Sequence, residues 1–129
     1  MITDKKKLRS LCDTKWFKIL LKPKCEICPR PAVQVHHFYH KGSYGHLRYD
    51  MENGISLCKE CHFALHSGGD AKKVEDRIEK VRGHEWREAL KERAWNRPGG
   101  SFITVKYYND ILEKLNQYEK GGGIPSSNI

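Results

Sequence analysis

The sequence predicts an α+β fold, in which a small β, β, α unit stapled by zinc lies between N-terminal and C-terminal helices. Three observations support this prediction. Two C-x2-C pairs enclose the middle of the chain, short alternating apolar segments lie next to them, and apolar residues recur at helical spacing on both flanks. At 129 residues, the chain has the size of one small domain.

The first segment of the chain predicts a basic helix. Thr3 or Asp4 can cap this helix, Pro23 marks its end, and residues 1–24 hold eight Lys or Arg side chains against two Asp. Its apolar positions are Leu8, Leu11, Cys12, Ile19 and Leu20. The first cations of this arm are candidates for contacts with nucleic-acid phosphates: Lys5, Lys6, Lys7 and Arg9.

Composition narrows the classes of protein to consider. The chain has 24 Lys and Arg against 16 Asp and Glu, a formal net charge of +8. This surplus favours a polyanionic partner such as nucleic acid, although a solvated lysine-rich helix face would also explain it. No stretch approaches the ~20 apolar residues that span a bilayer, and the N-terminus lacks the apolar centre of a secretory signal. We therefore expect a cytoplasmic protein without a membrane partner.

Four of the five cysteines form two knuckles, Cys25 with Cys28 and Cys58 with Cys61. Two such knuckles are the usual way to place four thiolates around a structural Zn²⁺. A disulfide framework would need an even number of cysteines and a secretory context, and a redox C-x-x-C would explain only one pair. The fifth, Cys12, lies at apolar spacing and is expected to be a small buried side chain.

The segment between the knuckles predicts a β-hairpin with an expanded connection. Residues 33–35 and 55–57 alternate as two short strands, and a turn is expected at Asn53-Gly54 because Asn-Gly is a strong turn signal. A short helix should follow over residues 59–67 and end at Gly68-Gly69.

The C-terminal half predicts further helices. Residues 70–96 show helical spacing that is interrupted near Gly83, and Thr104 can cap a last helix. The expected apolar positions are Val74, Ile78, Val81, Ala89, Leu90, Ala94, Ile111, Leu112, Leu115 and Tyr118. Trp16, Trp86 and Trp95 are expected to pack between helices. The expected parts are thus a basic helical arm (1–24), a zinc-stapled core (25–69), C-terminal helices (70–120) and a disordered tail (121–129).

Histidines gather around the knuckles. His62 and His66 are four residues apart, so a helix would place both imidazoles on one face as half of a divalent metal site. His36 and His37 end the first strand and must point to opposite faces. One of these two rings can complete a three-imidazole site while the other stays free to accept a proton from water near neutral pH.

These residues, in this order, resemble the HNH endonuclease family: Val35-His36-His37, then Asn53, then Cys58-x2-Cys61-His62-x3-His66 between paired knuckles. The resemblance covers about residues 25–67 and implies the ββα-metal, treble-clef-like fold. It implies that His36, His62 and His66 ligate one catalytic metal ion and that His37 is the general base. It also implies that Asn53 holds the His37 loop in place and that the four knuckle cysteines bind structural Zn²⁺.

A metal-dependent endonuclease that hydrolyses DNA phosphodiester bonds is therefore the expected function. Three neutral imidazoles favour Mn²⁺, Co²⁺, Ni²⁺ or Zn²⁺ over Mg²⁺, although phosphate oxygens and waters would also allow Mg²⁺. Lys41 and Arg48 are expected near the scissile phosphate, and the planar fork of Arg48 suits a phosphate contact.

Residues 47–50 and 53–55 are also similar to phage-encoded HNH proteins, including the NinG/Rap recombination group. This similarity implies a phage or prophage protein acting in the bacterial host cytoplasm, with phage recombination or packaging proteins as partners. Two other functions stay open. A non-catalytic zinc-dependent module could bind nucleic acid through the basic arm, and a redox or metal-storage protein could use the same cysteines and histidines.

Overall fold

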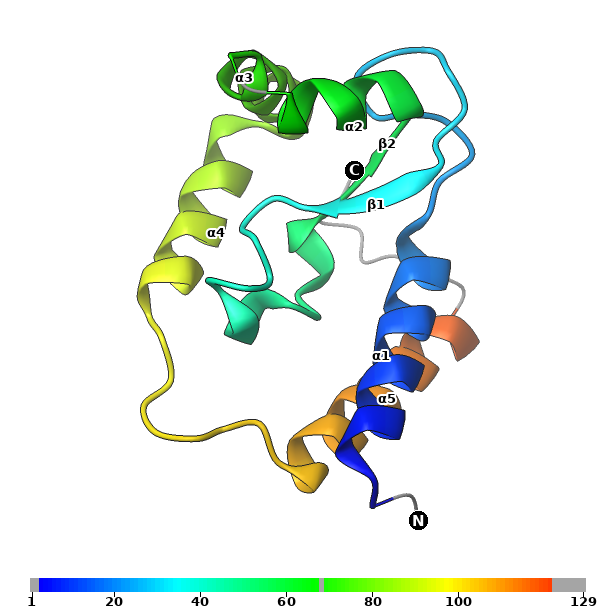
Figure 1. Cartoon of the computed structure of the whole chain (residues 1–129), viewed down its shortest axis with the longest axis vertical. Coiled ribbons are helices and arrows are strands. Elements are labelled where there is room, and N and C mark those ends of the chain that lie inside the picture. The colour runs from blue at the N-terminus through cyan, green and yellow to red at the C-terminus, as the bar shows by residue number, and fades with distance from the viewer. Residues whose placement is uncertain (1–2, 68, 122–129) are drawn as a thin grey trace.

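A two-stranded antiparallel sheet lies at the centre of the molecule, with helices on both of its faces (Figure 1). The computed structural model describes residues 3–67 and 69–121. Strand β1 (Gln34–His37) pairs with β2 (Gly54–Leu57), and the register sets His36 opposite Ile55 and His37 opposite Gly54. Because side chains alternate across a strand, one face of the sheet carries His36 and the other carries His37.

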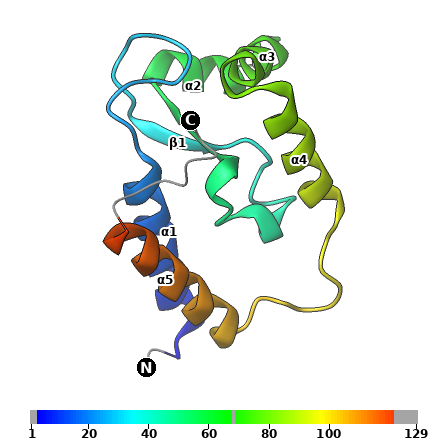
Figure 2. The same cartoon turned by 180° about the vertical axis from the view of Figure 1, so that it is seen from behind.

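Helix α1 (Lys5–Leu20) and helix α5 (Val105–Lys120) lie side by side on the His37 face of the sheet (Figures 1 and 2). The Asp4 carboxylate caps α1 by accepting from the amide of Lys6 at 2.9 Å, and Thr104 caps α5. Residues of α1 at a spacing of four turn inward and form the buried stripe Leu8, Cys12, Trp16 and Leu20. This stripe packs on Tyr108 and Leu115 of α5.

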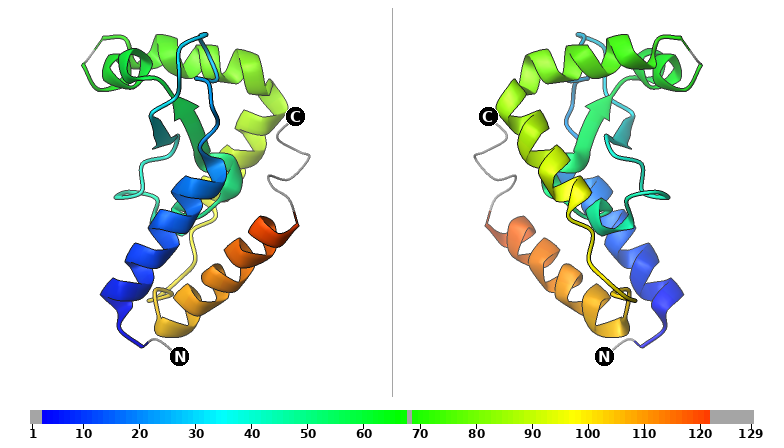
Figure 3. Two further views of the ribbon diagram at one scale, coloured as in Figure 1. Left: turned by 90° about the vertical axis from the view of Figure 1, so that its right-hand side faces the viewer. Right: turned by 90° about the vertical axis from the view of Figure 1, so that its left-hand side faces the viewer.

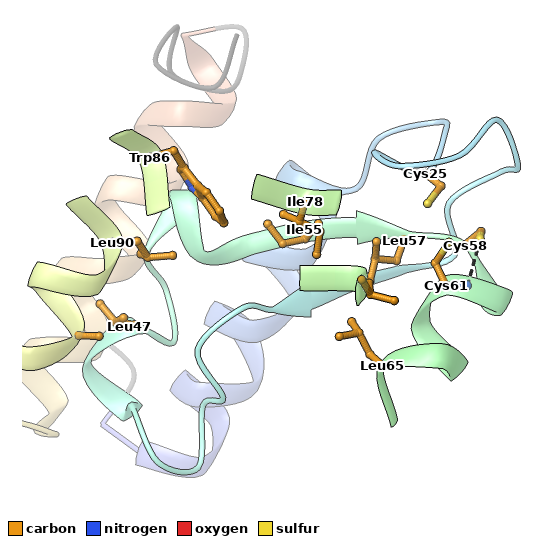
Figure 4. Packing of buried hydrophobic residues seen from close by; sticks show 12 residues of the cluster. Cys25, Leu47, Ile55, Leu57, Cys58, Cys61, Leu65, Ile78, Trp86 and Leu90 are labelled. Carbon is orange, nitrogen blue, oxygen red and sulfur yellow. Dashed lines mark hydrogen bonds between the residues drawn. The ribbon is translucent and has the colours of Figure 1, made fainter. Parts of the chain in front are cut away.

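Three more helices continue from the sheet: α2 (Lys59–His66), α3 (Ala71–Arg82) and α4 (His84–Trp95). Figure 3 shows α3 and α4 wrapping the edge of the molecule, with a bend between them at Gly83, whose φ of +104° favours glycine. The core beneath these helices joins Ile55 and Leu57 of β2 to Leu65, Ile78 and Leu90 (Figure 4).

This arrangement confirms the predicted α+β class, with a ββα unit flanked by helices. The capped first and last helices and the break at Gly83 are as expected. No helix within residues 3–67 and 69–121 has the length and apolar character of a membrane span. Gly68 and residues 122–129 lie outside the described residues, so the predicted end of α2 at Gly68 and the predicted disordered tail are untested.

Several side chains predicted to be buried are exposed instead. Leu11 is 39% exposed because the inward stripe of α1 runs through Leu8 and Cys12, and Val81 is 58% exposed because the next inward position on α3 belongs to Arg82. Ala89 is also exposed. Trp95, expected to pack between helices, is 60% exposed at the end of α4, whereas Trp16 and Trp86 are buried.

The connection between the strands also differs from the prediction. It contains two short 3-10 turns, η1 (Gly45–Leu47) and η2 (Met51–Asn53). Gly54 has an extended backbone with φ of −101° and starts β2, so Asn53-Gly54 is not a hairpin turn. A Cβ on Gly54 would lie 2.6 Å from Leu20 and 2.8 Å from Trp16. Glycine is needed here because α1 packs directly against the strand.

A buried ion pair ties α3 to the first knuckle. The Arg82 guanidinium donates to both carboxylate oxygens of Glu26, at 2.8 and 2.7 Å, and also to the carbonyls of Glu52 and Gly54. Glu26 in turn accepts from the amide of Ser56 at 2.9 Å. Burial acts to raise the pKa of Glu26, but the hydrogen bonds and charge of Arg82 outweigh it and lower that pKa.

Replacing Arg82 should therefore destabilise the protein strongly. Arg82→Ala leaves the Glu26 carboxylate buried without its partner, and both side chains are only 6% exposed, so we expect the free energy of unfolding to fall by about 3–5 kcal/mol. Lys80→Ala, which removes an exposed cation from the same helix, is the control and should change it by less than about 0.5 kcal/mol. Urea unfolding measures both. Equal stability of the two variants would contradict the structural role of the pair.

Candidate functional site

The four knuckle cysteines converge on one point. Their Sγ atoms all lie within 4.8 Å of one another, with Cys28 Sγ 3.4 Å from Cys58 Sγ and 3.8 Å from Cys61 Sγ. Four thiolates about 2.3 Å from a tetrahedral Zn²⁺ would lie about 3.8 Å apart. The cluster therefore has the ligand set and the dimensions of a structural zinc site.

Local structure holds these sulfurs in place. Cys58 is the N-cap of α2, and its Sγ accepts from the amide of Cys61 at 3.3 Å. Burial acts to raise the pKa of Cys28, but hydrogen bonds from the Arg30 amide and the neighbouring thiols lower it to about 7. This lowered pKa favours the thiolate of Cys28, which is the form that binds metal, whereas burial raises the pKa values of Cys25 and Cys61.

A second cluster joins β1 to α2. Ring nitrogens of His36, His62 and His66 all lie within 4.8 Å of one another, and the Nε2 atoms of His62 and His66 are 3.2 Å apart. Three nitrogens bound about 2.1 Å from one cation would be about 3.0–3.4 Å apart. The donor set and its spacing thus fit a divalent cation with three protein ligands, which leaves positions for water or substrate.

Two rings of this cluster, His36 and His62, have lowered pKa values, which favours the neutral form that can ligate a metal. Burial, followed by the neighbouring imidazoles, lowers the pKa of His36 to about 3. Burial and the nearby His66 also lower the pKa of His62. The three rings differ in solvent exposure: His36 and His62 are partly buried, and His66 is exposed. The site is therefore open to solvent at its His66 side.

His37 lies on the opposite face of β1 and is fixed by two contacts. Its ring stacks on the indole of Trp16, with centroids 4.3 Å apart and planes 8° apart. Its Nε2 lies 3.0 Å from the carbonyl oxygen of Arg48. A carbonyl can only accept, so Nε2 carries the proton and Nδ1 keeps the lone pair. Burial, together with the positive charge of Lys41, lowers the pKa of His37 to about 4, although the hydrogen bond to that carbonyl acts to raise it.

Helix α1 supports His37 by a second route. The Asp13 carboxylate of α1 holds both Nε and Nη2 of Arg48, at 2.8 and 2.7 Å, and also accepts from the hydroxyl of Tyr49 at 2.8 Å. This pair fixes the backbone whose carbonyl meets His37. The hydrogen bonds and charge of Asp13 raise the pKa of Arg48. The Arg48 guanidinium, which the sequence predicts to contact a phosphate, binds Asp13 instead. Arg48 contributes its backbone carbonyl oxygen to the site.

Asn53 is fully buried, and its amide group is fully used. Its Oδ1 accepts from the amide of Tyr39 at 2.8 Å, and its Nδ2 donates to the carbonyls of Tyr39 and Leu47, both at 3.1 Å. The backbone carbonyl of Asn53 also accepts from Phe38 at 2.8 Å. Asn53 thus binds the chain directly after His37, at Phe38 and Tyr39.

The remaining predicted residues lie at the surface. Lys41 is exposed in the turn after His40, close enough for its charge to lower the pKa of His37. Lys5, Lys6, Lys7 and Arg9 are exposed in the first two turns of α1. Trp16, on which His37 stacks, is seven residues further along that helix than Arg9, so the rise of 1.5 Å per residue separates the basic residues from Trp16 by roughly 10–17 Å along the helix axis.

Sequence reasoning missed three contributors to the site: Trp16, Asp13 and Gly54. The sequence predicts Trp16 as a packing residue, and the structure adds that the ring stacked on it is His37. The sequence predicts a turn at Gly54, whereas Gly54 provides the space that lets Trp16 approach. All three depend on the docking of α1, which no local motif indicates.

A sequence model of the HNH endonuclease family matches residues 25–68. The match spans both knuckles, both strands and α2, and thus both metal-binding clusters, and it leaves α1, α3, α4 and α5 outside. The search of curated proteins and the search of solved structures gave no match to this chain. The family match agrees with the resemblance found in the sequence, and α1 lies beyond it.

We expect Cys58→Ala to abolish binding of the structural metal. The substitution removes one of four clustered sulfurs and the cap of α2, so bound zinc, measured by elemental analysis of purified protein, should fall by about one ion per chain. Cys12→Ala is the matched control, because Cys12 is a buried thiol outside the cluster. Equal zinc content in the two variants would refute the four-thiolate site.

Proposed function

We propose that this protein is a metal-dependent endonuclease that hydrolyses phosphodiester bonds in DNA. One observation carries the proposal: three imidazoles are gathered within ligand distance of one another, beside a fourth imidazole that is held in one tautomer. A structural zinc module that only binds nucleic acid has no need for this second cluster. The family match over residues 25–68 supports the same reaction class.

In this proposal, His36, His62 and His66 hold one divalent cation. When bound, the cation supplies positive charge for the phosphoryl oxygens and for the departing 3′ oxygen. Neutral imidazoles suit Mn²⁺, Co²⁺, Ni²⁺ or Zn²⁺, and Mg²⁺ would depend on phosphate and water oxygens for its other ligands. The accessible position of His66 supports entry of a phosphate from solvent.

His37 acts as the general base. Because Nε2 donates to the Arg48 carbonyl, Nδ1 is the ring atom that can take a proton from the attacking water. The stack on Trp16 limits rotation of the ring, and Asn53 fixes the chain that follows it. Attack of this water on phosphorus with loss of the 3′ oxygen leaves a 5′-phosphate and a 3′-hydroxyl.

The basic first two turns of α1 bind the DNA backbone. Its exposed cations lie a short helix length from His37, so they would meet phosphates a few nucleotides from the cleaved bond. Lys41 lies closer and would contact a phosphate beside that bond. Lys15 differs from these residues, since it pairs with Glu119 of α5 and supports the packing of the two helices.

The similarity of residues 47–50 and 53–55 to phage-encoded HNH proteins and the NinG/Rap group stays a prediction. A phage or prophage origin, action in a bacterial host and phage recombination or packaging partners follow only from that similarity. The proposed endonuclease activity does not depend on them, because it is argued from the metal cluster and His37.

His37→Ala should abolish DNA cleavage while leaving the fold and the zinc content unchanged. Loss of the base should slow nicking of supercoiled plasmid with Mn²⁺ or Mg²⁺ by at least about 100-fold. His84→Ala, which removes an exposed histidine on α4, is the control and should cleave normally. Normal nicking by His37→Ala would refute the base assignment. If the wild-type protein binds plasmid but does not nick it with any of the five cations, the protein is a binding module.

Removal of the basic arm should weaken DNA binding without abolishing the chemical step. With Lys5, Lys6, Lys7 and Arg9 all replaced by Ala, we expect Kd for DNA to rise, and the slope of log K against log salt to become shallower by about 3 to 4. The rate at saturating DNA should stay within about threefold. A variant with unchanged salt dependence would show that the arm is only a solvated helix face.

A further inference from the structure

The surface next to the histidine cluster carries two large apolar side chains with no place in the core. Phe63 is 69% exposed and Val33 is 55% exposed. Phe63 follows His62 directly on α2, and Val33 directly precedes β1, where its amide donates to the carbonyl of Leu57 at 2.9 Å. Both side chains are therefore held on rigid elements while their apolar surfaces remain in water. Because both side chains line the same hollow, they form one apolar patch of the kind that marks a binding surface.

These side chains line one open hollow of about 730 Å³. Its other walls are Gln34, Lys59, Glu60, His62 and His66. His62 and His66 thus belong both to this hollow and to the imidazole cluster. Whatever binds through a phosphate at the cluster has its neighbouring groups within reach of Phe63. The hollow is continuous with the proposed catalytic site.

The charges at the hollow suit a nucleotide. Glu60 is engaged by Arg30 at 3.1 Å, which offsets its negative charge. Lys59 adds an exposed cation at the start of α2, one helical turn before Phe63. The hollow therefore offers a cation for a phosphate and an aromatic face for a flat apolar group, which is the combination found in grooves that bind single strands.

We propose that Phe63 and Val33 seat an unpaired nucleobase of the strand whose phosphate lies at the histidine cluster. This inference rests on the proposed function and adds a substrate class to it. A base stacks on an aromatic ring only when its own face is free, and in a duplex that face is covered by the neighbouring pair. The enzyme therefore acts best where the nucleotide next to the cleaved bond is unpaired, as in single-stranded or unwound DNA.

Cleavage of one sequence in two forms tests the proposal. Wild-type protein and Phe63→Ala, Phe63→Leu and Phe63→Trp are compared with Mn²⁺ on a single-stranded oligonucleotide and on its fully paired duplex. On the single strand, kcat/KM should fall about tenfold in Phe63→Ala, less in Phe63→Leu, and should be retained in Phe63→Trp. On the duplex, each change should be less than about twofold. Val81→Ala, which removes a similarly exposed apolar side chain from α3, is the control and should cleave both forms normally.

A binding measurement separates this inference from the proposed activity. Single-stranded oligonucleotides with 2-aminopurine at successive positions are mixed with His37→Ala protein and Mn²⁺, so that no cleavage is needed. Fluorescence should be quenched at one position, and His37→Ala combined with Phe63→Ala should lose that quenching.

Other outcomes overturn the inference in different ways. Equal losses on the single strand and the duplex would mean that Phe63 contacts paired DNA, and no loss on either would mean that it contacts none. A concentration-dependent dimer that Phe63→Ala dissociates would assign the hollow to a second copy of this chain. In all three cases the endonuclease proposal would survive, whereas a wild-type protein that cleaves neither form would overturn both.

Discussion

The alternation of side chains along β1 is the constraint on which the rest of the site depends. Adjacent residues of a strand cannot share a face, so His36 and His37 need separate surroundings. The His36 face is completed by α2, which adds two more imidazoles at a spacing of four residues. The His37 face is completed by α1, which adds the indole of Trp16. The adjacent residues His36 and His37 thus require a helix on each face of a very small sheet.

Two further interactions keep so small a sheet in place. The cysteine cluster joins the first knuckle to the start of α2, and the Glu26–Arg82 pair joins the same knuckle to the end of α3. Arg82 also holds the carbonyls of Glu52 and Gly54, at the point where the connection returns to β2. A domain with few buried side chains gains from such links, because its apolar core alone gives a modest stability.

The parts of the fold that follow from local chemistry were predictable. Capping by Asp4 and Thr104, the break at Gly83, the two C-x2-C pairs and the His62–His66 pair depend on residue type and spacing over short distances. The errors share a different cause. Val81 fits helical spacing, but the neighbouring Arg82 turns inward to meet a carboxylate 56 positions away in sequence. Long-range pairs of this kind are not indicated by periodicity.

Some parts of the candidate site could likewise be predicted from the sequence, and others could not. The cysteine and histidine sets were visible as motifs, whereas the contacts that orient His37 were not, because they arise where α1 meets the connection between the strands. His37 Nε2 donates to a peptide oxygen, so no replacement of the Arg48 side chain can delete the acceptor itself. The path of the main chain therefore determines the orientation of the His37 ring. This orientation changes when that path changes, which makes it sensitive to insertions or deletions between the strands and to loss of the Asp13–Arg48 pair that fixes the path.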